Sequence, residues 1–202
     1  MTPLVVTAPP IATPVATTAP TAGPLELEVD DLALQAGTYT RTGFEPAITL
    51  GLDGAWWAVV VEDSVLWLRH GPDAPDVVTV QILRPDWAYA PGAIAVQDLD
   101  AQLVVDTIQA NDLLVEIESS TSRIGGLEGL EITVENPTKD DAWILHAPIG
   151  DLKVPAGHRS WMAFFDTPDG VVAILVGGPI SGWDAALALA EPLLESIRFS
   201  VR

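Results

Sequence analysis

An alternation of apolar and polar residues over positions 114–136 is the clearest pattern in the chain. The apolar members of this pattern are Val115, Ile117, Leu130, Ile132 and Val134. A period of two is typical of a strand with one buried side and one solvent-facing side. The pattern therefore predicts a β-hairpin, with Gly125 and Gly126 in the connection. Gly129, inside the second arm, indicates either a bulge or the close approach of another backbone.

Shorter alternating or apolar segments, bounded by turn residues, predict further strands. They lie at residues 25–30, 38–40, 44–52, 57–61, 65–68, 77–83, 142–146, 158–166, 171–176 and 198–201. Turn signals such as Asp53-Gly54 and Thr167-Pro168-Asp169-Gly170 join several of them directly. Residues 85–92 are expected to form a loop. Because sequential strands are joined by short turns, the sheet is expected to be largely antiparallel.

Two segments have helical periodicity. The first, residues 98–111, has Asp98 as its predicted N-cap, Asn111 as its C-terminal stop and one apolar side. The second begins with a capping-box-like spacing at Ser181-Gly-Trp-Asp184, and Pro192 is expected to kink or restart it. The predicted fold class is α+β: one domain in which two amphipathic helices cover a central, largely antiparallel sheet.

The first 24 residues differ from the rest of the chain. They contain 6 Pro, 6 Thr and 5 Ala and no charged residue. This composition predicts a disordered, semi-rigid spacer at 1–24 that precedes a folded domain at 25–202. An ordinary flexible terminus or a misplaced start codon would have the same composition.

Composition limits the classes of partner. The chain has 28 Asp and Glu against 9 Lys and Arg, a net charge of −19, and 49% of its residues are hydrophobic. The charge argues against nucleic acid and anionic membrane surfaces as partners, since both require clustered cations. The sequence has no cysteine, no apolar window of membrane-spanning length and no basic segment typical of a signal peptide.

Three stretches, taken in order, resemble a known family. They are Phe44-Glu-Pro-Ala-Ile-Thr-Leu50 with Gly54-Ala-Trp56, Ile124-Gly-Gly-Leu-Glu-Gly-Leu130, and the closing helix followed by Ser196-Ile-Arg-Phe199. Their order resembles PsbP-like α/β/α sandwich domains, and more closely the LpqN-type lipoproteins of bacterial cell envelopes. The resemblance implies an extracytoplasmic, lipid-tethered protein with interaction roles and no shared catalytic residues. The chain departs from that family in having no lipobox cysteine and no signal segment.

Candidate chemistry is sparse. His70, His146 and His158 do not have a metal-binding spacing, and the acidic pairs do not form a D-x-D-x-D-G calcium loop. Ser160 lies near His158 and Asp166, but the G-x-S-x-G sequence of a nucleophile elbow is missing. No catalytic residue, metal or cofactor is therefore predicted.

Seven tryptophans are the least ordinary feature of the composition. Trp57, Trp67, Trp143 and Trp161 lie in apolar strand segments and are expected in the core. Trp56, Trp87 and Tyr89 are expected in turns, where their rings could form a platform for a carbohydrate or a peptide. Plugs that close the ends of the sandwich are the alternative interpretation of these three residues.

The leading functional hypothesis is a non-enzymatic, extracytoplasmic accessory or binding module of the cell envelope, surface-tethered or secreted, whose partner is another envelope protein or a surface ligand. A carboxylate-dependent hydrolase of polar polymers and a purely structural domain are the alternatives. Without an upstream export signal the protein would be cytoplasmic.

Overall fold

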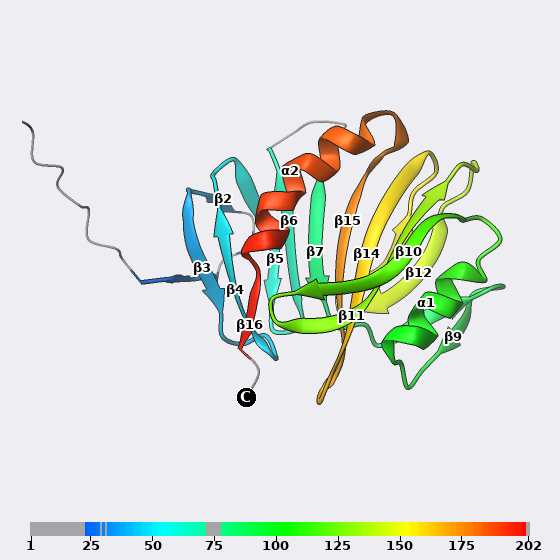
Figure 1. Cartoon of the computed structure of the whole chain (residues 1–202), viewed down its shortest axis with the longest axis horizontal. Coiled ribbons are helices and arrows are strands. Elements are labelled where there is room, and N and C mark those ends of the chain that lie inside the picture. The colour runs from blue at the N-terminus through cyan, green and yellow to red at the C-terminus, as the bar shows by residue number, and fades with distance from the viewer. Residues whose placement is uncertain (1–22, 29, 31, 72–77, 201–202) are drawn as a thin grey trace, which may run out of the picture.

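The computed structural model describes residues 23–28, 30, 32–71 and 78–200, and these form three β-sheets, two α-helices and one short 3-10 helix (Figure 1). The predicted spacer at 1–24 lies outside the described residues, except for Gly23 and Pro24. The strand expected at 25–30 is reduced to β1 (Leu25–Glu26).

The largest sheet has eight strands in the order β10-β11-β14-β15-β7-β6-β5-β2. Their bounds, in that order, are Val115–Ile124, Leu127–Asn136, His158–Thr167, Gly170–Pro179, Thr79–Leu83, Val65–His70, Trp56–Glu62 and Leu32–Leu34. Two four-stranded sheets accompany it. The first is β1-β3-β4-β16, with β3 (Gly37–Arg41), β4 (Ala47–Leu52) and β16 (Arg198–Ser200); the second is β13-β12-β8-β9, with bounds Gly150–Val154, Ala142–Ala147, Trp87–Ala90 and Ile94–Val96.

The predicted antiparallel pairing is confirmed. Among the described residues, each pair of neighbouring strands is antiparallel except β1 and β3. The segment 85–92 is not the expected loop, because it contains β8. β8 has only four residues, and β12 and β9 pair with it on either side.

Helix α1 (Ala101–Gln109) starts two residues later than predicted. Its N-cap is Asp100, whose Oδ1 accepts a hydrogen bond from the Leu103 amide at 2.7 Å, whereas Asp98 lies before the helix with a φ of 53°. Helix α2 (Trp183–Ser196) follows the 3-10 turn η1 (Ile180–Gly182) and continues through Pro192. Its N-cap is Gly182, so the predicted capping box does not form. No helix in the described residues is long and apolar enough to span a membrane.

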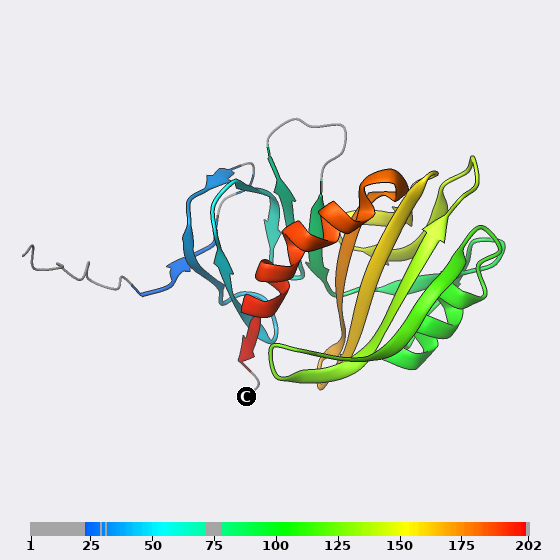
Figure 2. The same ribbon diagram turned by 45° about the horizontal axis from the view of Figure 1, so that its top comes forward.

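Two hydrophobic cores lie on opposite faces of the eight-stranded sheet. Phe165, Val172 and Ile174 point into the first core, which α2, β3 and β4 close. Phe164 and Ala173 point into the second core, which α1 and the β13-β12-β8-β9 sheet close. Figure 2 shows α2 and α1 on opposite sides of β14 and β15. Each helix thus shares its face with a small sheet, instead of covering the sheet alone as predicted.

The predicted hairpin is confirmed as β10 and β11, joined through Gly125 and Gly126. Its first arm is not half-buried, however: Val115 and Ile117 are 49% and 47% exposed, because β10 is an edge strand without a layer over it. The bulge lies at Ile117, between the paired residues Glu116 and Glu118. Gly129 allows the close approach of another backbone, the second possibility predicted for it, since any Cβ there would clash with the Phe164 carbonyl group.

The two arms of the hairpin should differ in their contribution to stability. Ile132 is fully buried in β11, so Ile132→Ala should lower the free energy of unfolding by about 2–5 kcal/mol. The matched variant Ile117→Ala, on the exposed edge strand, should lower it by less than about 0.5 kcal/mol. Urea unfolding of the full chain measures both values, and equal losses would contradict this description of the hairpin.

Candidate functional site

Four ring side chains lie together on the outer side of the β13-β12-β8-β9 sheet. They are Trp87 and Tyr89 from β8 and Trp143 and His146 from β12, and we call them the aromatic face. Neighbours that alternate with them, such as Ala88 and Leu145, point inward and are fully buried in the second core. The outward direction of the rings is thus imposed by the burial of the opposite side of each strand.

Trp87 and His146 form the centre of the aromatic face. They are opposite each other in the β8–β12 pairing. Their rings stack with centroids 3.7 Å apart and an angle of 4° between planes. Each ring therefore covers one face of the other, and the stack fixes the orientation of both side chains.

Asp151, on β13, holds two members of the aromatic face in place. Its Oδ1 accepts a hydrogen bond from the Tyr89 hydroxyl at 2.5 Å and lies 2.6 Å from His146 Nδ1. Both hydrogen bonds lower the pKa of the Asp151 carboxyl below its ordinary value, and the bond from Tyr89 has the larger effect. The same bond to Asp151 raises the pKa of the Tyr89 phenol above 10.0.

Trp143 is the most exposed ring of the aromatic face, at 41%. Lys153, opposite it on β13, places its Nζ 5.3 Å from the centre of the ring. Lys153 also pairs with Asp141, and this contact, together with the Ala156 amide, lowers the pKa of the Asp141 carboxyl. The charged groups beside Trp143 are therefore already paired with each other.

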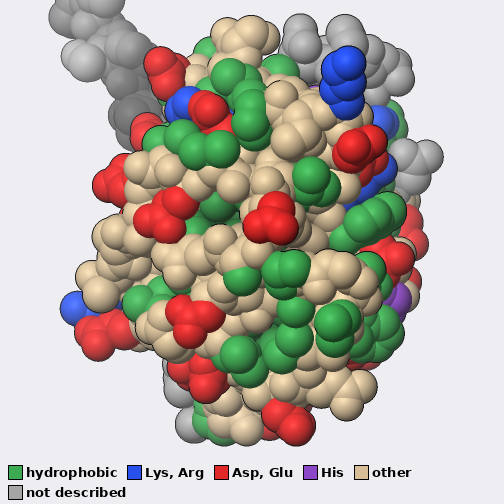
Figure 3. Space-filling view, turned by 90° about the vertical axis from the view of Figure 1, so that its right-hand side faces the viewer, with side chains coloured by type: hydrophobic (Ala, Val, Ile, Leu, Met, Phe, Trp, Pro, Cys, Tyr) green, Lys and Arg blue, Asp and Glu red, His purple; other side chains and the backbone are tan. Residues whose placement is uncertain are grey.

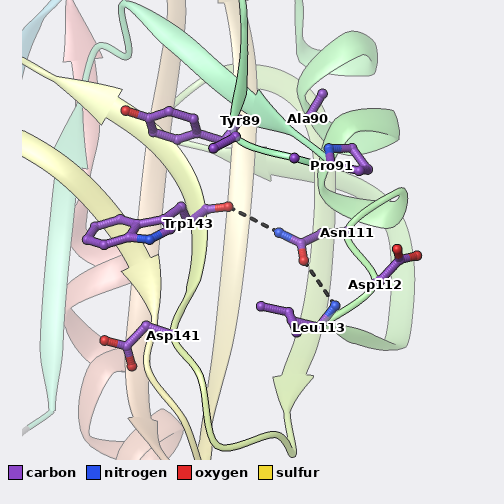
Figure 4. A pocket seen from close by; sticks show the side chains of 10 residues that line it. Tyr89, Ala90, Pro91, Asn111, Asp112, Leu113, Asp141 and Trp143 are labelled. Atoms are coloured by element: carbon purple, nitrogen blue, oxygen red, sulfur yellow. Dashed lines mark hydrogen bonds between the residues drawn. The ribbon is translucent and has the colours of Figure 1, made fainter.

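A pocket of about 260 Å³ opens beside Trp143 and Tyr89 (Figure 4). Its walls are the turn after β8, the loop after α1 and the start of β12. Asn111 joins two of these walls: its Nδ2 donates to the Trp143 carbonyl oxygen at 3.1 Å, and its Oδ1 accepts from the Leu113 amide at 3.1 Å. The predicted helix stop at Asn111 thus shapes the pocket.

The surface around this end of the molecule combines apolar and acidic side chains. Figure 3 shows hydrophobic side chains gathered on this side, with Asp and Glu side chains among and around them. In the β13-β12-β8-β9 sheet, Trp143 and Ile94 are large exposed hydrophobic residues. Exposed apolar side chains that gather on one side of a protein are typical of contact surfaces.

The structure separates the three residues of the predicted platform. Trp87 and Tyr89 lie side by side on the aromatic face, although on a strand and not in a turn. Trp56 is wrongly predicted as a turn residue: it lies in β5, only 2% exposed, in the other core. Trp143, expected in the core, is exposed. The alternation Trp87-Ala-Tyr-Ala was the signal that could have placed these rings on one side of a strand.

The other candidate groups do not assemble into a site. Asp166 Oδ1 accepts from the Ala101 amide at 2.9 Å, and His158 Nδ1 lies 3.0 Å from the Ala156 carbonyl oxygen. Neither side chain is hydrogen-bonded to Ser160 in the part of the chain that the structure describes. Within the described residues, no group of three or more His, Asp or Glu side chains is placed to hold a metal ion.

Comparisons with known proteins give similarities of chain path. No protein-family model matches the sequence, and no curated protein does. The structure is similar to the solution structure of cyanobacterial PsbP (CyanoP) from Synechocystis sp. PCC 6803, with a TM-score of 0.46 and 12% identity, over 90% of this chain and 100% of that chain. It is also similar to a crystal structure from Bacteroides thetaiotaomicron VPI-5482, with a TM-score of 0.39 and 8% identity, over 76% of this chain and 45% of that chain. PsbP is the group that the sequence motifs resemble; the nearer likeness to LpqN-type lipoproteins stays a prediction.

The raised pKa of Tyr89 gives a direct test of the Asp151 contact. In the folded protein the pKa of the Tyr89 phenol should lie above that of an ordinary tyrosine, and Asp151→Asn should lower it because the charged acceptor is lost. A titration followed by ¹³C NMR of labelled tyrosine measures this value. Asp141→Asn is the matched control and should leave Tyr89 unchanged. An unaltered Tyr89 pKa in Asp151→Asn would contradict the contact.

Proposed function

We propose that this protein is a non-enzymatic binding module of the cell envelope that holds neutral glycan chains on its aromatic face. The observation that carries the proposal is the exposed Trp143 ring beside Tyr89 and the Trp87–His146 stack, all on one side of the same sheet. Flat aromatic rings pack against the apolar face of a sugar, while nearby polar groups bond its hydroxyls.

The charges around the aromatic face favour a neutral ligand over a cationic peptide. The chain is strongly acidic overall, but Asp151 is occupied by Tyr89 and His146, and Asp141 by Lys153. Each carboxylate still has lone pairs free to accept a hydroxyl hydrogen bond. A sugar uses such acceptors without the cost of separating an existing ion pair.

The same carboxylates support binding over hydrolysis. A carboxylate-dependent glycosidase needs one carboxylic acid whose pKa is raised, so that it can protonate the leaving group. Both Asp141 and Asp151 have a lowered pKa and are ionised at neutral pH. A pair in which both members are held as bases is suited to accepting hydrogen bonds.

The proposed location depends on the sequence. An uncharged Pro/Thr/Ala stretch at 1–24 is typical of spacers that hold a domain away from a surface. The resemblance to LpqN-type lipoproteins also implies an extracytoplasmic role. These two features, and not the geometry of the site, support the assignment to the envelope.

Affinity electrophoresis of the full chain in gels that contain neutral polysaccharides tests the proposed function. We expect retardation by at least one polysaccharide, with a dissociation constant that rises roughly tenfold or more in Trp143→Ala, because the largest exposed ring is lost. Calorimetry with the matching oligosaccharide measures the same change in solution.

Leu189→Ala is the control for that experiment. Leu189 is exposed to a similar extent, 44%, but lies on α2, on the opposite face of the large sheet. Its removal should leave the affinity unchanged. The proposed function would be overturned if no neutral polysaccharide changed the mobility of the protein. Retardation that persists in both Trp143→Ala and Tyr89→Ala would also overturn it.

A further inference from the structure

A second concave surface lies where the eight-stranded sheet extends beyond the small sheet. Two rows of paired residues cross β14, β15, β7 and β6 on the side that faces the second core: Ser160–Gly177–Thr79 and Leu175–Gln81–Trp67. The free edge of β13 stands beside these rows. Together they enclose a volume of about 360 Å³, which we call the sheet groove. This size is at the lower end of the range for small-molecule sites.

The sheet groove gathers polar side chains that have no hydrogen-bond partner among the described residues. The Trp67 indole Nε1 is buried and has no hydrogen-bond acceptor within the described residues. The side chains of Thr79, Gln81 and Ser160 line the same groove. None of the three makes a side-chain hydrogen bond to any residue that the structure describes. Buried polar groups are normally paired, so the unpaired Trp67 indole N–H indicates a polar ligand. Thr79 and Gln81 are partly exposed, which leaves their polar atoms accessible to such a ligand.

Gly177 keeps the floor of the sheet groove open. It lies between Ser160 and Thr79 in the cross-strand row and is only partly buried. A Cβ there would point toward the same space, 3.4 Å from Thr79 Oγ1 and 3.8 Å from Ser160 Oγ. Its φ lies outside the left-handed region, so a larger residue would fill the groove without straining the backbone.

The charges at the rim of the sheet groove have partners elsewhere. Asp151 is bonded to Tyr89 and His146, Lys153 is paired with Asp141, and His158 Nδ1 faces the Ala156 carbonyl oxygen. The floor itself presents an indole donor, two hydroxyls and one amide, all neutral. Such a set matches a ligand that has both oxygen acceptors and hydroxyl donors and carries no net charge.

We infer that the sheet groove is a binding site for a single neutral sugar unit, separate from the aromatic face. The indole N–H of Trp67 donates to a ring or hydroxyl oxygen of the sugar. Gln81, Thr79 and Ser160 bond its other hydroxyls. The inference does not depend on glycan binding at the aromatic face, because none of the floor residues belongs to it.

The test uses ¹⁵N-labelled full-length protein and NMR titration with glucose, galactose, arabinose and N-acetylglucosamine at millimolar concentrations. With at least one of these sugars, the Trp67 indole resonance and the amides of residues 79, 81, 160 and 177 should shift together. Glucuronate and glucosamine, the charged analogues, should produce smaller shifts at equal concentration.

Two variants make the result specific to the sheet groove. Gly177→Val, which fills the floor, should raise the dissociation constant at least tenfold, and Trp67→Phe, which keeps a ring but loses the donor, should raise it several-fold. Trp143→Ala should not change these shifts, although it should weaken binding at the aromatic face. No shift of the Trp67 indole with any neutral sugar, or shifts that persist in a folded Gly177→Val protein, would overturn the inference.

Discussion

The structure depends on one hairpin, β14–β15, that is buried on both faces. Every residue from Val171 to Val176 is at most 7% exposed, and the adjacent Phe164 and Phe165 point into different cores. Because successive residues of a strand point to opposite sides, a strand that is apolar throughout needs a layer on each side. The two helices and the two small sheets are those layers.

This constraint also explains the positions of the glycines next to the hairpin. Gly129 allows β11 to lie against the Phe164 backbone, where any side chain would clash. Gly178 faces Ala186 on α2, and a Cβ there would lie 3.0 Å from the Ala186 Cβ, closer than an ordinary contact. Glycines at these two places let β11 and α2 approach the hairpin closely.

The two candidate sites are consequences of the same layering. The small sheet buries its inner side in the second core, so its alternate residues, among them Trp87, Tyr89 and Trp143, must face solvent. The β13-β12-β8-β9 sheet is also narrower than the eight-stranded sheet that it covers. Trp67 and Gln81 of the large sheet are therefore left uncovered beside it. The stack on His146 and the bonds to Asp151 then hold the exposed rings in one orientation, as a binding surface requires.

The sequence by itself determined the local elements: the hairpin at 114–136, the turn at Pro168-Asp169, both helices and the antiparallel pairing, because periodicity and turn chemistry act over a few residues. It also singled out Trp87 and Tyr89. Only the tertiary structure decided that Trp56 is buried, that Trp143 is exposed, and that β10 is an edge strand. Those outcomes depend on which layer covers each face and on which strands are neighbours. The periodicity of a segment does not identify its partner, and β8 and β12 pair although they are more than 50 residues apart.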